Sequence, residues 1–171
     1  DIDRSRGLGD VYKRQSHIEQ ASDGGFIISA TTESYGQGGK DIWLFKTSSS
    51  GLIEWNKYIG TPYDDYSGQV LETDDGGFIL IGSRGSSDQN DNDIWLIKTN
   101  SQGDSSWTRS YGGNQFDRGN DILADDQGGF ILLGSTESQG NGGKDIWLLK
   151  VDEDGNDQWN NTYGNGSDDI G

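Results

Sequence analysis

The sequence KDIWLFK at residues 40–46 occurs three times in this chain with small changes. It returns as NDIWLIK at 92–98 and as KDIWLLK at 144–150, so each copy begins 52 residues after the one before. Other residues keep this spacing: a phenylalanine after two glycines at Phe26, Phe78 and Phe130, and a second tryptophan at Trp55, Trp107 and Trp159. A fixed period of about 50 residues indicates a repeat protein.

Each period contains four short segments that are typical of strands. In the middle copy we expect strands over residues 65–73, 78–82, 93–99 and 105–111. The first two are joined by Asp-Gly-Gly at 75–77, and these residues favour the positive φ of a tight hairpin turn. The second and third strands are continuously apolar, which predicts that both of their faces are covered, whereas the fourth alternates and is expected to be partly exposed.

Four antiparallel strands per period, stacked on like units, predict a β-propeller. We therefore expect an all-β chain of about three four-stranded antiparallel blades in an open arc, over residues 16–63, 64–115 and 116–167. Residues 168–171 would begin a further blade. A β-sandwich is the fallback, but it does not account for the strict repeat. Because closed propellers have about four to eight blades, we expect the remaining blades in the same parent chain and self-association of the isolated arc.

Residues 1–15 do not follow the repeat. The period predicts a glycine at position 8 and an aspartate at position 13, where Leu8 and Lys13 stand. The sequence RGLGDVYKRQ at 6–15 resembles the translated sequencing-adaptor tail found in fragmentary metagenomic reading frames. We expect 1–15 to be a non-native segment, with a divergent natural segment as the alternative. The chain also lacks methionine, and we expect it to be a fragment.

Composition and charge narrow the choice of partners. The net charge of −16 argues against binding to nucleic acid or to an anionic membrane surface, because both would repel the chain. No apolar stretch approaches the length of a membrane span, so membrane insertion is not expected. The absence of cysteine excludes disulfides and thiolate zinc sites.

The pattern GGFIxxG…GGKDIWLxK…G…W…YGG…D covers residues 16–171. It resembles the secreted propeller-like repeats of large bacterial and archaeal surface proteins. The resemblance implies an extracellular or cell-surface location. We expect the chain to act as a non-catalytic binding or structural scaffold, with a protein or glycan ligand that the sequence does not identify.

Aspartates recur where each blade is expected to join the next, at Asp65, Asp117 and Asp169. A ring of such carboxylates can hold calcium, which prefers oxygen ligands; we expect no other cofactor. A residue repeated in every blade also fits a bond from its side chain to the backbone of its turn, and this structural role is favoured. The same choice applies to Asp41 and its counterparts Asp93 and Asp145.

A site for one asymmetric ligand must differ between the blades. On the face expected to carry the binding loops, the departures from the repeat are Pro62, Tyr63, Arg84, Phe116 and Arg118. An arginine beside an aromatic ring can hold a carboxylate or stack on a sugar. Neutral surface variation is the alternative interpretation.

Catalysis has little support in the sequence. The chain has one histidine, His17, and no recurring set of nucleophile, histidine and acid. Adjacent carboxylates on a strand point to opposite faces and do not form a shared acid–base pair. We therefore predict that the chain is not an enzyme. Two alternatives are a glycan-active propeller enzyme with its catalytic residues in further blades, and a calcium-stabilised adhesion module.

Overall fold

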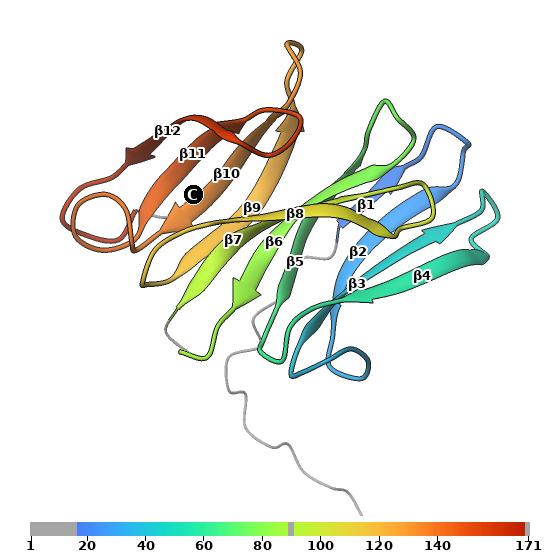
Figure 1. The fold of residues 1–171 in the computed structure, drawn as a ribbon, viewed down its shortest axis with the longest axis horizontal. Coiled ribbons are helices and arrows are strands. Elements are labelled where there is room, and N and C mark those ends of the chain that lie inside the picture. Colours follow the sequence, from blue (N-terminus) through green and yellow to red (C-terminus); the bar gives the residue numbers. More distant parts are fainter. Residues whose placement is uncertain (1–16, 89–90, 170–171) are drawn as a thin grey trace, which may run out of the picture.

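The computed structural model describes residues 17–88 and 91–169, and this part of the chain contains twelve strands and no helix. Each run of four consecutive strands forms one antiparallel sheet (Figure 1). The first sheet consists of β1 (His17–Gln20), β2 (Phe26–Thr32), β3 (Asp41–Thr47) and β4 (Ile53–Ile59). The second consists of β5 (Tyr66–Glu72), β6 (Phe78–Gly85), β7 (Asn92–Thr99) and β8 (Ser105–Tyr111). The third consists of β9 (Asp117–Ala124), β10 (Phe130–Thr136), β11 (Asp145–Val151) and β12 (Asp157–Tyr163).

The predicted all-β fold with three four-stranded antiparallel sheets is confirmed. Strand β6 runs to Gly85, beyond the expected end at residue 82, because Gly85 still pairs with Asn92 of β7. The predicted non-native segment 1–15 lies outside the described residues. So do residues 170 and 171 of the expected further blade.

The turn between the first two strands of each sheet depends on glycine. Gly24, Gly76 and Gly128 have φ values of 84°, 75° and 87°, in the left-handed region that other residues rarely adopt. The amide of each donates a hydrogen bond to the carbonyl three residues earlier, at 2.8–3.1 Å. The glycine pairs before Phe26, Phe78 and Phe130 therefore recur because each blade needs the same turn.

The middle sheet is covered on both faces (Figure 1). Phe78, Leu80 and Trp95 pack against the first sheet. The side chains on the opposite face of the middle sheet pack against the third sheet; they are Ile79, Ile81, Ile94 and Leu96. All of these side chains are at most 6% exposed. Complete burial of one large aliphatic side chain contributes about 1.5–3 kcal/mol, so these contacts account for the continuous apolar runs.

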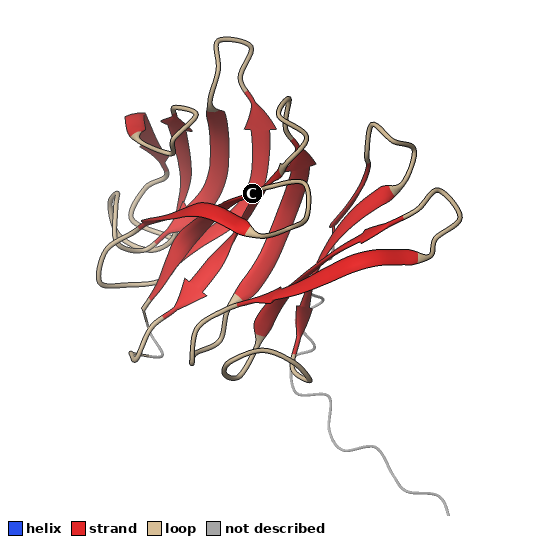
Figure 2. Cartoon of the chain, turned by 45° about the vertical axis from the view of Figure 1, so that its right-hand side comes forward, coloured by secondary structure: helices blue, strands red, loops and turns tan. Residues whose placement is uncertain are grey.

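The three sheets fan out as separate layers (Figure 2). Their first strands lie closest together, since β5 contacts both β1 and β9. Their fourth strands are at the outside, where β4, β8 and β12 are largely exposed. The arrangement is that of three blades of an open, propeller-like fragment.

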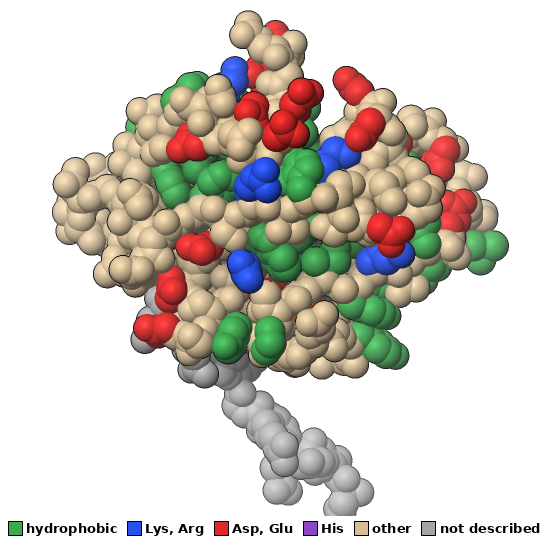
Figure 3. Space-filling view, viewed as in Figure 1, with side chains coloured by type: hydrophobic (Ala, Val, Ile, Leu, Met, Phe, Trp, Pro, Cys, Tyr) green, Lys and Arg blue, Asp and Glu red, His purple; other side chains and the backbone are tan. Residues whose placement is uncertain are grey.

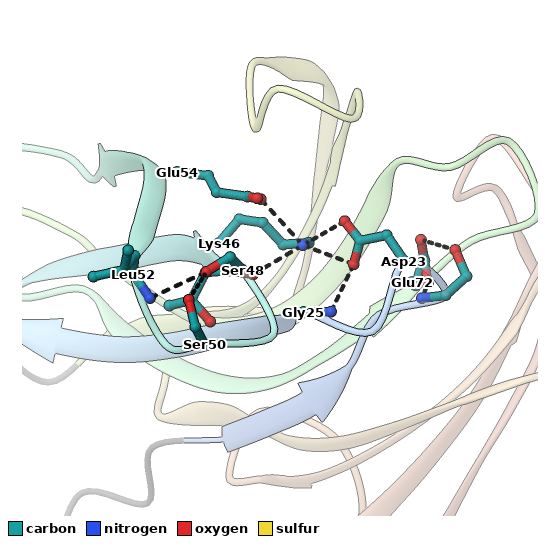
Figure 4. Close-up of polar contacts among 10 residues, drawn as sticks. Asp23, Gly25, Lys46, Ser48, Ser50, Leu52, Glu54 and Glu72 are labelled. Carbon is teal, nitrogen blue, oxygen red and sulfur yellow. Dashed lines mark hydrogen bonds and ion pairs between the residues drawn. The ribbon is translucent and has the colours of Figure 1, made fainter.

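The lysine that ends each repeated motif forms an ion pair with the turn between the first two strands of its own blade. Lys46 is only 4% exposed, and its Nζ lies 2.7 Å from Asp23, 3.3 Å from Glu54 and 3.0 Å from the carbonyl of Thr47 (Figure 4). Lys98 repeats this contact with Asp75 at 2.8 Å and holds the pKa of that carboxyl well below its usual range. In the third blade Lys150 pairs with Asp125 instead, because Gln127 takes the place of the aspartate.

Candidate functional site

The three candidate calcium aspartates make the same contact with the backbone of their turns. The amide four residues earlier donates to Asp65, Asp117 and Asp169, at 2.5 Å, 3.0 Å and 2.8 Å. These bonds hold the connection between successive blades, which is the turn role described above. Within residues 17–88 and 91–169, no group of three or more histidine, cysteine, aspartate or glutamate side chains is placed to share a metal ion.

The first blade junction has a fully satisfied carboxylate. Asp65 is completely buried, and its Oδ2 accepts the amide and the hydroxyl of Thr61, while its Oδ1 accepts the amide of Gly85 at 2.9 Å. Burial raises the pKa of Asp65, the three donors lower it, and the carboxylate of Asp41 raises it again, so that the pKa lies above its usual value.

The second junction has the same aspartate, but both of its donors, the amide of Gly113 and the hydroxyl of Ser138, bind Oδ2 of Asp117, at 3.0 Å and 2.6 Å. The amide of Glu137, which corresponds to Gly85, donates instead to the carbonyl of Phe116 at 2.9 Å. Oδ1 of Asp117 is therefore buried with no hydrogen-bond partner among the described residues. An unpaired buried acceptor costs free energy, so a hydrogen-bond donor or a cation bound at this atom would stabilise the fold.

A second aspartate approaches Asp117. A Cβ on Gly112 would lie 1.9 Å from Oδ1 of Asp93 and 2.7 Å from Oδ2 of Asp117, so both carboxylates meet at this glycine. Oδ1 of Asp93 is also buried without a hydrogen-bond partner in the described chain. Burial raises the pKa of Asp93, as do the carboxylates of Asp91 and Asp117, and Arg84 opposes them.

The pairing of the two aspartate series was missed by sequence reasoning. A usable signal was present, because Asp93, Gly112 and Asp117 recur together as Asp145, Gly164 and Asp169. A glycine that recurs between two recurring carboxylates indicates a place where only a hydrogen atom fits.

Three of the five residues predicted on the ligand face lie in one cleft. Pro62, Tyr63 and Arg84 line a hollow of about 430 Å³ between the first and second blades. Its other lining residues are Gln37, Gly60, Thr61, Gly85, Ser86, Ser87, Asp91 and Asp93. Tyr63 is 42% exposed, and the guanidinium of Arg84 lies 5.8 Å from the ring centre of Trp95, which orients it.

The other two predicted residues lie elsewhere. Phe116 forms a single bridge with Asn92, and Arg118 is exposed on β9 opposite Ser135, so neither lines the cleft. His17 lies on β1, where its Nδ1 accepts the amide of Val70 of β5 at 3.4 Å. Burial lowers the pKa of His17, and Asp121 raises it in part.

Comparisons with known proteins add no family to this description. No protein-family model matches the sequence, and no curated protein matches it. In the part of the chain that the structure describes, no helix is long and apolar enough to cross a membrane.

Proposed function

We propose that this chain is a non-catalytic propeller repeat, outside the cell or at its surface, that serves as a scaffold and binds a ligand in the cleft between its first two blades. One observation carries the proposal. The residues that break the repeat at Pro62, Tyr63 and Arg84 gather in that cleft. The recurring residues are engaged in turns, blade closure and packing.

The chemistry of the cleft favours a glycan as the ligand. Its volume of about 430 Å³ lies within the usual range of small-molecule sites. An exposed tyrosine ring can stack on the apolar face of a sugar, and the carboxylates of Asp91 and Asp93 can accept its hydroxyl hydrogens. Among the described lining residues, Arg84 is the one cationic side chain, and it can hold a carboxylate on an acidic sugar.

Binding of the full chain to an array of neutral and acidic glycans tests this proposal. We expect Tyr63→Ala and Arg84→Ala to weaken binding by about tenfold or more, since each removes a contact worth over about 1 kcal/mol. Arg118→Ala is the matched control, because this arginine is exposed outside the cleft. Equal loss in the control would count against the cleft, and release of a cleaved sugar would favour the alternative of a glycan-active enzyme.

The alternative of a calcium-stabilised adhesion module has an observation of its own. Oδ1 of Asp93 and Oδ1 of Asp117 have no hydrogen-bond partner among the described residues, and the two carboxylates meet at one blade junction. Calcium takes oxygen ligands from carboxylates, carbonyls and water. On this proposal millimolar calcium raises the thermal unfolding midpoint by several degrees over a chelator, because the ion binds only the folded chain. The Asp93→Asn variant should lose this response; an unchanged midpoint of the wild-type chain would exclude the module.

Asp93→Asn should itself stabilise the chelated protein at neutral pH. The ordinary pKa of this carboxyl is 3.8, and the folded chain raises it. Ionisation is therefore easier in the unfolded state, and stability is lost as the pH rises through the carboxyl range. The neutral amide avoids this loss. Urea unfolding should show the gain at about pH 7 and little difference at about pH 3, where both states are protonated; a gain equal at both pH values would contradict the assignment.

A further inference from the structure

The outer face of the third sheet has the same design as the covered face of the second. In the second sheet Ile79, Ile81, Ile94 and Leu96 are 0% exposed beneath the third sheet. The corresponding residues one period later are Ile131, Leu133, Ile146 and Leu148. Leu133 is 39% exposed and the other three are half-buried, so this face keeps the apolar side chains while no sheet of the described chain covers it.

The outer face of the first sheet carries the side chains that form the other side of an observed junction between blades. In the second sheet Val70, Phe78, Leu80, Trp95 and Ile97 face the neighbouring blade and are at most 6% exposed. Their counterparts one period earlier are Ile18, Phe26, Ile28, Trp43 and Phe45. Ile18 is 61% exposed and the others are half-buried. On the side of the molecule seen in Figure 3, apolar side chains likewise reach the surface among scattered charged groups.

The polar contacts between blades follow the same repeat as the apolar ones. Side chains of the innermost strands accept amides of the next blade: His17 accepts from Val70 at 3.4 Å, and Gln69 accepts from Ile122 at 2.7 Å. Asp121 occupies the same position in β9; its Oδ1 accepts the adjacent amide of Ile122 at 3.0 Å, and the side chain is exposed, so that its other oxygen can accept a further donor. The third sheet thus offers both an apolar face and an acceptor to a blade of the same kind.

We propose that the outer face of the third sheet binds the outer face of the first sheet of a second copy of this chain. The observed junction between the second and third sheets supplies the template, because its two halves recur on these two faces. Each copy carries both of these outer faces, one on its first sheet and one on its third. Two copies can therefore satisfy both faces at once and close a ring of six sheets, within the range of about four to eight blades in closed propellers.

This pairing is heterologous, since different surfaces meet, and it closes only when the rotation per blade suits six. The net charge of −16 on each copy opposes association, and salt screens such repulsion. The apolar contact is not weakened by screening. Pairing should therefore strengthen as salt is raised, unlike an association that depends on ion pairs.

The test measures the mass of the full 171-residue chain by light scattering after size exclusion, at about 0.15 M and 0.5 M salt. We expect a two-chain species that is favoured at the higher salt. Leu133→Glu on the third sheet and Ile18→Glu on the first should each weaken pairing by about tenfold or more. Both side chains are exposed enough to accept a carboxylate without disturbing the fold. Gln102→Glu, at an exposed turn residue of the second sheet, which takes part in neither of the proposed junctions, should pair like the original chain.

Mixing the two face variants distinguishes the modes of pairing. Alone, each variant lacks one half of every junction and should be monomeric. Together they retain one intact junction and should form a mixed pair. Pairing of Ile18→Glu with itself would instead show that two third-sheet faces meet. That result would overturn the proposal, as would a monomeric original chain or open-ended polymers.

Discussion

Leu96→Ala is expected to lower the free energy of unfolding by about 2–5 kcal/mol, the usual cost of emptying a buried leucine site. Leu96 is fully buried in the cluster between the second and third sheets, where no solvent can fill the space that the substitution leaves. Urea unfolding at submicromolar concentration, followed by tryptophan fluorescence, measures the change in the separate chains. This is one of the two largest effects expected for a single substitution here.

Leu148→Ala is the control for this result, since Leu148 is the same residue of the same motif one period later. It is half-buried on the outer face of the third sheet, so the loss in the separate chain should be about 1 kcal/mol or less. Equal losses for Leu96 and Leu148 would mean that the outer face is already covered in solution. The comparison holds side chain, strand and motif constant and varies only the presence of a neighbouring sheet.

Asp65→Asn is expected to cost about 1–3 kcal/mol, although it changes neither size nor shape. Both oxygens of Asp65 accept hydrogen bonds from Thr61 and Gly85, and an amide nitrogen in place of either oxygen would point a donor at a donor. One buried donor is then left unpaired, and removal of the charge, whose burial raises the pKa of Asp65, offsets the weakening of the other bonds. Chemical denaturation of the variant measures the loss.

Asp169→Asn is the matched control in the last repeat. Asp169 accepts one amide through one oxygen, from Asn165, and a rotated asparagine can still accept it. We expect a change within about 0.5 kcal/mol, as for most substitutions away from buried networks. If Asp65→Asn proved as mild as the control, Asp65 would not hold the junction in the way its contacts indicate.

The two junction aspartates illustrate how a repeat can hide a local difference. Asp65 and Asp117 occupy the same place in the sequence period, yet only Asp65 has a donor for its second oxygen. The difference arises twenty residues later, where the amide of Glu137 turns to a carbonyl and the amide of Gly85 does not. The proposed calcium position and the proposed ligand cleft therefore each belong to one blade junction, and each can be tested by substitutions at that junction.

The repeat itself determined the architecture. Fixed spacing of KDIWLxK, the Gly-Gly turns and the alternating tryptophans was sufficient to predict four strands per period and three similar sheets, because strand pairing, turn chemistry and burial on both faces are local or periodic properties. The same reasoning selected Tyr63 and Arg84 as departures from the repeat, and both line the cleft. It selected Phe116 and Arg118 by the same rule, and they lie apart from it.

Only the tertiary structure decided which side chains meet across a blade junction. Asp93 and Asp117 are 24 residues apart in the sequence and converge on Gly112, and Arg84 reaches the ring of Trp95. Such contacts depend on the twist and separation of neighbouring sheets, which no spacing in the sequence encodes. The exposure of Leu133 against the complete burial of Ile81 has the same origin, because a side chain is buried only where a second sheet arrives to cover it.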